Sequence, residues 1–390
     1  MRVLFVSTPV PSHLTPLTPL AWALRAAGHE VLVTGQPDVM SAAHAAGLSG
    51  VPVGEPFNVN ELLRRHLPDG VRLIHVVGPT TTATILRGAE MWRMRARQML
   101  PHYLELARAW RPDMVITDPL EFAGPVVAGA LRVPYVQHRW GVDALGDPSR
   151  VSAREFLQPE CDRLGLDRLP EPAIILDPCP PELQIPGLTP AHPIRHIPVN
   201  GTRPAPAWAA RRTARHRVCV SLGRQTAHLN GLPLIRTIIA GAAGLDDVET
   251  IVTAAPDHHA ELGPVPPSVR LVAPTPLDRF LHTCDVVIHH GGASTTLTVT
   301  AEGVPQLVLP QFADQFGHAE RIAALGAGIA LDDDVRQDDP AAIRDAVDAL
   351  LSEPRYRASA TRLGHVMAAM PSPAEVVRTL EGLVPLPVGA

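Results

Sequence analysis

The sequence contains no lysine, and arginine accounts for all 34 of its lysine and arginine positions. Without lysine the chain cannot form the Schiff base that a pyridoxal-phosphate enzyme requires. It also cannot complete a Walker A loop, whose lysine contacts the nucleotide phosphates. Both classes of site are therefore excluded.

Cysteine, aromatic residues and long apolar runs are also scarce. The four cysteines are widely spaced and form no C-x-x-C pair, so neither a disulfide framework nor a zinc knuckle is expected. The net charge of -5 argues against a nucleic-acid partner. No stretch reaches the roughly 18 apolar residues of a membrane span, and the apolar run at residues 3–6 is too short for a signal peptide. We expect a soluble, cytoplasmic protein with no membrane partner.

What is present is the composition of a globular protein. The chain has 390 residues, of which 46% are hydrophobic and 19% charged, and this length favours two domains. Apolar runs at residues 3–6 and 31–34 alternate with a helical pattern at residues 17–24. Such alternation predicts a mostly parallel, doubly wound sheet.

A proline-rich stretch interrupts this alternation around Asn200 and Gly201, and the alternation then starts again. The sequence predicts a first domain at residues 1–195, a linker at 196–214 and a second α/β domain at 215–370. Residues 371–390 are expected to form a helix that packs back on the first domain. Two such domains joined by a stiff linker leave a cleft in which a ligand can bind.

One segment near residue 290 combines histidines, glycines and hydroxyl side chains. It consists of His289, His290, Gly291, Gly292, Ala293, Ser294 and Thr295. The segment follows a buried strand and opens a helix, so its backbone N–H groups are suited to bind an anion. A tight turn with a capping serine or threonine is the alternative. We favour phosphate binding, because two histidines and two glycines exceed what a cap needs.

These residues carry a resemblance to a known family. Residues 290–295 resemble the donor-diphosphate motif of bacterial (actinomycete-type) natural-product glycosyltransferases with the GT-B fold. Residues 220–224, 274–277 and 310–315 are similar to three further elements of that family. The likeness covers essentially the whole chain and is nearest to enzymes that attach deoxysugars to aromatic polyketides.

The resemblance implies a fold and a set of donor contacts. The fold would be GT-B, with two Rossmann-like domains facing each other across a cleft. Ser221, Gly223 and Arg224 would close over the diphosphate, and Leu277 would lie against the nucleotide base. Asp314 and Gln315 would bind hydroxyl groups of the donor sugar. No metal or cofactor is expected.

Two residues of the first domain are candidates for catalysis. His13 lies between the first strand and the first helix, and an imidazole with a pKa near ~6.5 can accept an acceptor's proton at neutral pH. The family has its base at this position, although a histidine can also simply pack a helix start. Asp118, after the strand at residues 114–117, either orients His13 or caps the next helix.

The acceptor site is less well defined by the sequence. Trp92, His138 and Trp140 lie in segments that mix aromatic and polar residues, which suits a flat apolar acceptor. Ordinary surface helix explains the same residues equally well.

The combined prediction is an inverting glycosyltransferase of antibiotic biosynthesis. It would move a deoxysugar from a nucleoside diphosphate, dTDP above others, to a small aromatic polyketide, with His13 as general base. Two alternative functions remain open: a UDP-sugar epimerase with the same fold, and a non-catalytic nucleotide-sugar-binding auxiliary protein. A homodimer also remains open. NAD binding is disfavoured, because the loop after the first strand lacks glycine.

Overall fold

The computed structural model describes residues 1–79 and 81–384, and only the backbone of Thr82. The chain divides into two compact units. Unit 1 comprises Met1–Val59, Thr81–Ile197 and Met370–Ala390, and unit 2 comprises Asn60–Thr80 and Pro198–Ala369. This division differs from the predicted one at residues 60–80, which were predicted as part of the first domain. Residues 385–390 of the predicted C-terminal segment lie outside the described residues.

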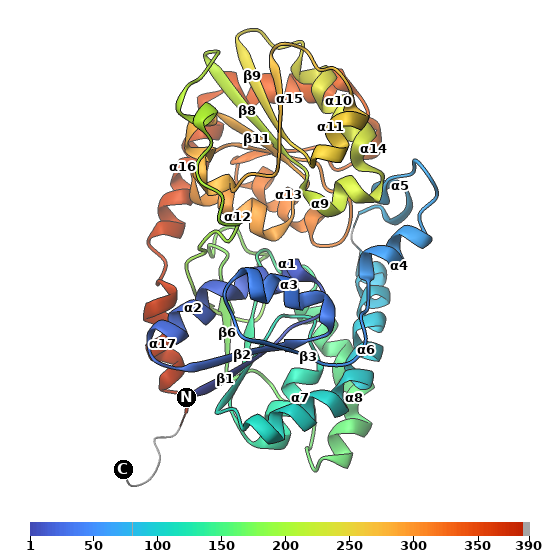
Figure 1. Ribbon diagram of the computed structural model, residues 1–390, viewed down its shortest axis with the longest axis vertical. Helices are drawn as coiled ribbons and strands as arrows, with labels where there is room; N and C mark the ends of the chain where they lie inside the picture. Colours follow the sequence, from blue (N-terminus) through green and yellow to red (C-terminus); the bar gives the residue numbers. More distant parts are fainter. Residues whose placement is uncertain (80, 385–390) are drawn as a thin grey trace. The chain divides into compact units, whose positions relative to one another are not determined.

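Unit 1 is built on a parallel seven-stranded sheet (Figure 1). Its strands are β1 (Arg2–Val6), β2 (Glu30–Gly35), β3 (Gly50–Pro52), β4 (Met114–Thr117), β5 (Tyr135–His138), β6 (Ile174–Asp177) and β7 (His192–Pro193). The strand order is β3-β2-β1-β4-β5-β6-β7. The side chains of residues 3–6 are fully buried, as an apolar central strand of a parallel sheet requires.

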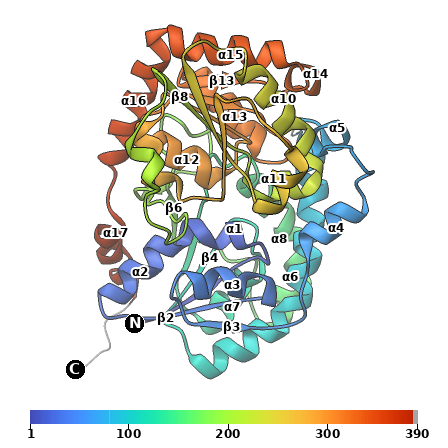
Figure 2. The ribbon, with the colours of Figure 1, turned by 45° about the horizontal axis from the view of Figure 1, so that its top comes forward.

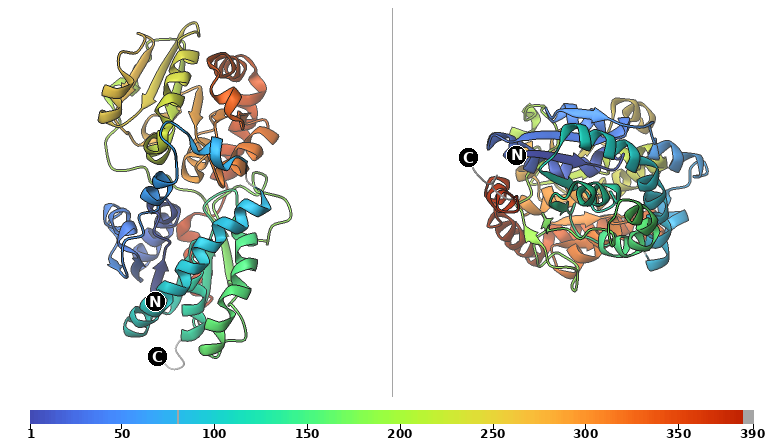
Figure 3. Two further views of the ribbon diagram at one scale, coloured as in Figure 1. Left: turned by 90° about the vertical axis from the view of Figure 1, so that its right-hand side faces the viewer. Right: turned by 90° about the horizontal axis from the view of Figure 1, so that it is seen from below.

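Helices cover this sheet. They are α1 (Pro11–Leu14), α2 (Thr18–Ala26), α3 (Pro37–Ala45), α6 (Thr82–Trp110), α7 (Ala123–Leu131), α8 (Gly146–Arg163) and α17 (Pro373–Glu381). α17 packs on α2, and the long helix α6 lies along α8 (Figures 1 and 3). Among the residues that the structure describes, no helix combines the length and apolarity needed to cross a bilayer.

Unit 2 contains a parallel six-stranded sheet. Its strands are β8 (His216–Ser221), β9 (Val248–Thr253), β10 (Val269–Val272), β11 (Val286–His289), β12 (Gln306–Val308) and β13 (Gly328–Ala330), in the order β10-β9-β8-β11-β12-β13. Its helices are α5 (Leu73–Val77), α9 (Gly223–Thr226), α10 (Leu232–Ala242), α11 (Pro256–Leu262), α12 (Ala293–Ala301), α13 (Gln315–Ala324), α14 (Asp334–Gln337), α15 (Pro340–Ser352) and α16 (Pro354–Ala368). The short helix α4 (Val59–Arg65) begins at the boundary between the units.

Both faces of the unit 2 sheet are buried, because successive strand residues point to opposite sides. Val218 and Val220 of β8 belong to an apolar cluster that includes buried residues of α10 and α15. Cys219, between them, belongs to a different cluster that includes Val299 of α12. Accordingly α10 packs with α15 and α12 packs with α16 (Figure 2).

Candidate functional site

The two groups of predicted site residues lie at the switch point of each sheet, where the strand order reverses. In unit 1, β1 pairs with both β2 and β4, and His13 and Asp118 follow the carboxyl ends of β1 and β4. In unit 2, β8 pairs with both β9 and β11, and Ser221 and His290 lie at the same ends of β8 and β11. Open α/β sheets bind ligands at such points.

In unit 1 a threonine connects the two predicted catalytic residues. Nδ1 of His13 lies 2.7 Å from Oγ1 of Thr8, and that hydroxyl donates to Oδ2 of Asp118 at 2.9 Å. The backbone N–H of Thr8 donates to the same carboxylate oxygen at 2.8 Å. The other oxygen of Asp118 accepts from the backbone N–H of Leu120 at 3.0 Å. The Asp118 carboxylate is therefore linked to His13 through Thr8, and it also accepts from the backbone of the turn that follows it.

The directions of these hydrogen bonds fix the tautomer of His13. A hydroxyl has one hydrogen, and Thr8 gives its hydrogen to the Asp118 carboxylate, which can only accept. Nδ1 of His13 must then donate to the Thr8 oxygen. In the neutral ring, Nε2 is left with the free lone pair, which is what a general base needs.

Burial sets the charges of this group. Burial lowers the pKa of His13 to about 3, and the positive charge of Arg95 adds to this, so the ring is neutral at pH 7. Burial also raises the pKa of Asp118 to about 6, and the carboxylate of Glu121 adds to this shift. Arg95 and Glu121 form a fully buried ion pair, with Nη1 2.7 Å from Oε2.

Two of the three predicted acceptor residues surround His13. The ring centroid of Trp140 lies 3.8 Å from that of His13, and the centroid of Trp92 lies 6.0 Å away. The indole Nε1 of Trp140 is buried without a hydrogen-bond partner in the described part of the chain. His138 differs, because its Nδ1 lies 2.6 Å from the backbone oxygen of Arg139.

In unit 2 the ring of His290 lies between two glycines. A Cβ atom on Gly223 would come within 2.9 Å of its Cε1, and one on Gly292 within 2.4 Å of its Nε2. Nδ1 of His290 is buried and has no partner among the described residues. Burial lowers the pKa of His290 to about 4. Only glycine at both positions leaves room for this ring.

The first turn of α12 is open to an anion. Gly292 is its N-cap and offers no side chain, and Gly291 has the positive φ of 84° that the loop requires. Ala293, Ser294 and Thr295 of the first turn are half-buried. Uncapped N–H groups at the start of a helix attract negative charge.

Three predicted donor-binding residues have different surroundings from those expected. Nδ1 of His289 accepts from the backbone N–H of Gly291 at 3.0 Å, and Nε2 lies 2.8 Å from Oε1 of Gln306. His289 is fully buried, so it shapes the glycine loop and cannot face a ligand here. Leu277 packs in the apolar cluster with Phe280. Oε1 of Gln315 accepts from the backbone N–H of Gln311 at 2.8 Å.

The remaining donor candidates are accessible. Ser221 and Asp314 are half-buried, and Gly223 and Arg224 are exposed. Burial raises the pKa of Asp314 to about 6. The acidic run at residues 332–334 acts locally, because Asp333 caps α14 and pairs with Arg336. Within the described residues, no group of three histidine, cysteine or acidic side chains is arranged to hold a metal ion.

Comparison with known proteins identifies the family to which this chain belongs. Residues 22–223 match the erythromycin biosynthesis protein CIII-like N-terminal domain, and residues 236–383 match the C-terminal domain of the same description. The chain belongs to the EryCIII-like glycosyltransferase family. The predicted resemblance and the predicted class of enzyme are thereby confirmed.

Individual relatives agree with this family. The chain is 37% identical to the L-demethylnoviosyl transferase of Streptomyces niveus, over 97% of each chain. It is 32% identical to the aclacinomycin-T 2-deoxy-L-fucose transferase of Streptomyces galilaeus, over 98% of this chain and 96% of that one. The structure of the spinosyn rhamnosyltransferase SpnG with thymidine diphosphate matches with a TM-score of 0.88 and 39% identity, over 98% and 100% of the two chains. This match confirms the GT-B fold of the EryCIII-like chain.

Sequence reasoning missed two supporting residues of this EryCIII-like glycosyltransferase. Thr8 bridges His13 and Asp118, and only its position two residues after the first buried strand could have drawn attention to it. Gln306 fixes His289 from the neighbouring strand, and a polar residue inside an apolar strand run was its one signal.

Proposed function

We propose that this enzyme transfers a deoxysugar from dTDP to a polyketide aglycone, with inversion at the anomeric carbon. The names of the relatives support this substrate class, since they include an L-demethylnoviosyl transferase, an aclacinomycin-T 2-deoxy-L-fucose transferase and a 10-deoxymethynolide desosaminyltransferase. SpnG has been solved with thymidine diphosphate and also with the spinosyn aglycone.

The observation that carries the proposal is the hydrogen-bonded chain from His13 through Thr8 to Asp118. Nε2 of His13 takes the proton of the acceptor hydroxyl while the acceptor oxygen forms a bond to the anomeric carbon. The bond from that carbon to the phosphate oxygen breaks, and dTDP leaves with the electron pair. Asp118, ionised above about pH 6, stabilises the imidazolium through Thr8.

The leaving group is bound by unit 2. The diphosphate gains negative charge in the transition state, and preorganised donors are most effective where such charge develops. The open first turn of α12 and the His290 ring supply these donors without a metal ion. Transfer should therefore continue in the presence of EDTA.

A thermal-shift panel followed by product analysis tests the proposal. dTDP at 100 times its dissociation constant should stabilise the protein by roughly 2.7 kcal/mol, more than equal concentrations of UDP, GDP or NAD. With a dTDP-deoxysugar and a polyketide aglycone, proton NMR of the product should show the anomeric configuration opposite to that of the donor. Retention of configuration would contradict the single-displacement mechanism, and a preference for UDP with no transfer would favour an epimerase.

A further inference from the structure

Residues 60–79 of unit 2 contain a buried arginine whose partners lie far along the chain. Arg72 is 2% exposed and precedes α5. Its Nη1 donates to Oε1 of Gln311 at 3.1 Å and to Oε1 of Gln337 at 2.7 Å. Its Nη2 donates to Oδ1 of Asp338 at 2.6 Å. These partners are 239 to 266 positions away in the sequence.

Apolar and backbone contacts hold the same segment in place. Leu67 and Leu73 are buried together with Leu229. Nδ2 of Asn230 donates to the backbone oxygens of Pro68 and Val71, at 3.0 and 2.9 Å. Figure 1 shows the α4–α5 segment in blue, with α5 near α14. Arg72 is therefore fixed from several sides and is not an isolated surface contact.

The two glutamines extend this contact into the loop of residues 310–315. Because an arginine only donates, the amide oxygens of both glutamines must face Arg72. Their Nε2 groups then face the loop, where both donate to the backbone oxygen of Pro310, at 3.2 Å from Gln311 and 3.0 Å from Gln337. Removing the guanidinium would take one donor from each amide oxygen, and the two amides would then be held only by their Nε2 bonds to each other and to the backbone oxygens of Leu309, Pro310 and Leu331.

Other bonds also hold this loop: Oε1 of Gln315 accepts from the backbone N–H of Gln311 at 2.8 Å, and Nδ1 of His318 lies 2.9 Å from the backbone oxygen of Asp314. Residues 309–314 form no helix or strand between β12 and α13. Ala313 has a φ of 54°, a conformation that a non-glycine residue adopts only when its neighbours impose it. The loop ends at Asp314, which is the N-cap of α13.

We propose that Arg72 is a positioning residue for the donor sugar, because it holds the 310–315 loop, and with it the Asp314 carboxylate, in place through Gln311 and Gln337. The inference rests on the proposed function. Immediately after this segment the chain continues into α6, which carries Trp92 beside His13. The amino-terminal part of the sequence thus carries the proposed base and, through Arg72, also supplies a restraint on the 310–315 loop.

The test compares a ligand that contains the sugar with one that lacks it. In Arg72→Met the KM for the dTDP-sugar should rise about tenfold. This is the effect of losing one hydrogen bond between a sugar hydroxyl and the charged Asp314 carboxylate. The Kd of dTDP should change by less than about twofold, because the hydrogen bonds of Arg72 go to Gln311, Gln337 and Asp338 and to none of residues 290–295, although Gly291 of that segment lies against Gln315. A merely structural role would weaken binding of both ligands equally. Arg72→Lys keeps the positive charge but lacks the guanidinium fork whose two nitrogens serve the amides and Asp338, so it should regain thermal stability without regaining KM.

Controls separate this inference from the proposed function. Arg357→Met removes an arginine that donates to the backbone oxygen of Asp285 in the same unit, and it should change neither KM nor Kd. If Arg72→Met does not fold, Gln337→Met should show the same rise in KM. An unchanged KM in the folded variants, or a full recovery of KM in Arg72→Lys, would overturn the inference. Failure of the wild-type protein to bind dTDP would instead overturn the proposed function.

Discussion

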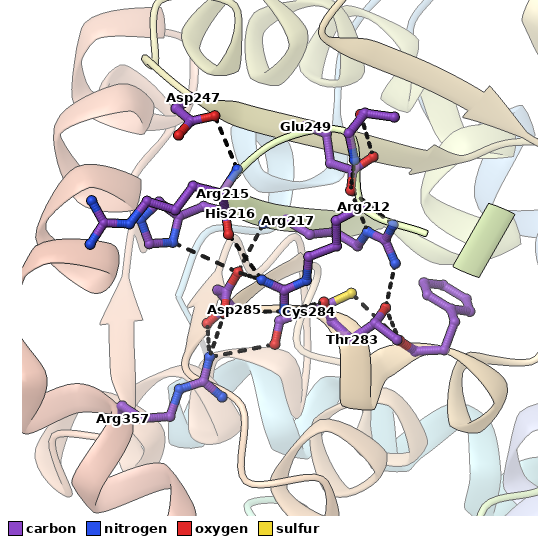
Figure 4. A network of polar contacts seen from close by, with 12 residues as sticks. Arg212, Arg215, His216, Arg217, Asp247, Glu249, Thr283, Cys284, Asp285 and Arg357 are labelled. Carbon is purple, nitrogen blue, oxygen red and sulfur yellow. Dashed lines mark hydrogen bonds and ion pairs between the residues drawn. The ribbon is translucent and has the colours of Figure 1, made fainter. Parts of the chain in front are cut away.

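The two ends of the unit 2 sheet differ in how their polar groups are paired. At the amino end, the fully buried Arg217 of β8 donates to Oε1 of Glu249 and to Oγ1 of Thr283, at 2.9 and 2.6 Å (Figure 4). It also donates to backbone oxygens of Trp208, Ala209 and Arg211. Every nitrogen of its guanidinium is used.

At the carboxyl end, some polar groups are left without a partner. Nδ1 of His290 is buried without a partner among the described residues, and no side chain caps the first turn of α12. A buried polar atom without a hydrogen-bond partner lowers the free energy of unfolding. At these residues the contrast is between Arg217, whose guanidinium is fully paired within the fold, and the start of α12, whose N–H groups no side chain caps.

In unit 1, Nε2 of His13 has a free lone pair and serves as the proposed base. We expect the largest effect from His13→Ala. Loss of the base should lower kcat by about 10³-fold, within the range of general base catalysis. The melting temperature and the dTDP affinity should stay close to those of the wild type, as judged by differential scanning fluorimetry and calorimetric titration. His102→Ala, which changes an exposed histidine of α6, is the matched control. Transfer by His13→Ala at a comparable rate would remove His13 from the mechanism.

At the amino end of the unit 2 sheet, we expect the opposite result: Arg217→Met should lower stability and leave dTDP affinity unchanged. The variant leaves the buried Glu249 carboxylate without its positive partner and with only its two hydrogen bonds from Thr213, which should lower the free energy of unfolding by about 3–5 kcal/mol. Urea denaturation measures this loss, and dTDP affinity of the folded protein should be unchanged. Adding Glu249→Gln should recover part of the stability, because it removes the uncompensated charge. A loss of dTDP affinity without a loss of stability would show that the two ends are not distinct.

The neighbouring histidines 289 and 290 sharpen the comparison within one loop. His290→Ala should weaken dTDP binding by about tenfold or more with little change in melting temperature. His289→Ala should mainly lower the melting temperature, because it leaves the Gln306 amide and the Gly291 N–H without their partners. Equal effects of the two variants on both measurements would contradict the separation.

The sequence predicted these sites because their positions follow from strand and helix order. Apolar runs located β1, β4, β8 and β11, and the loops after adjacent parallel strands must meet at one edge of a sheet. His13 and Asp118 could therefore be placed near each other without knowledge of their contacts. The loop of His290 could be recognised in the same way.

Other features depend on contacts that local patterns do not contain. His289 ends its strand pointing inward, where Gln306 of the next strand meets it, so its role depends on a side chain 17 positions away. The assignment of residues 60–79 to unit 2 depends on Arg72 and its partners more than 200 positions later. Thr8 was missed for a different reason: a hydroxyl between two ionisable groups has no spacing pattern of its own.

The pH profile gives the smallest expected effect and distinguishes Asp118 from His13. Burial raises the pKa of Asp118 to about 6 and lowers that of His13 to about 3, so the first group to change as pH falls from 7 is the carboxylate. Its negative charge is lost below about pH 6, and the imidazolium formed during transfer is then less stable. kcat should therefore fall about tenfold between pH 7 and pH 5. In Asp118→Asn the rate should be low and nearly independent of pH over this interval, whereas Asp314→Asn should keep the slope. A slope that survives in Asp118→Asn would mean that another group, with His13 the first to examine, controls the acid limb.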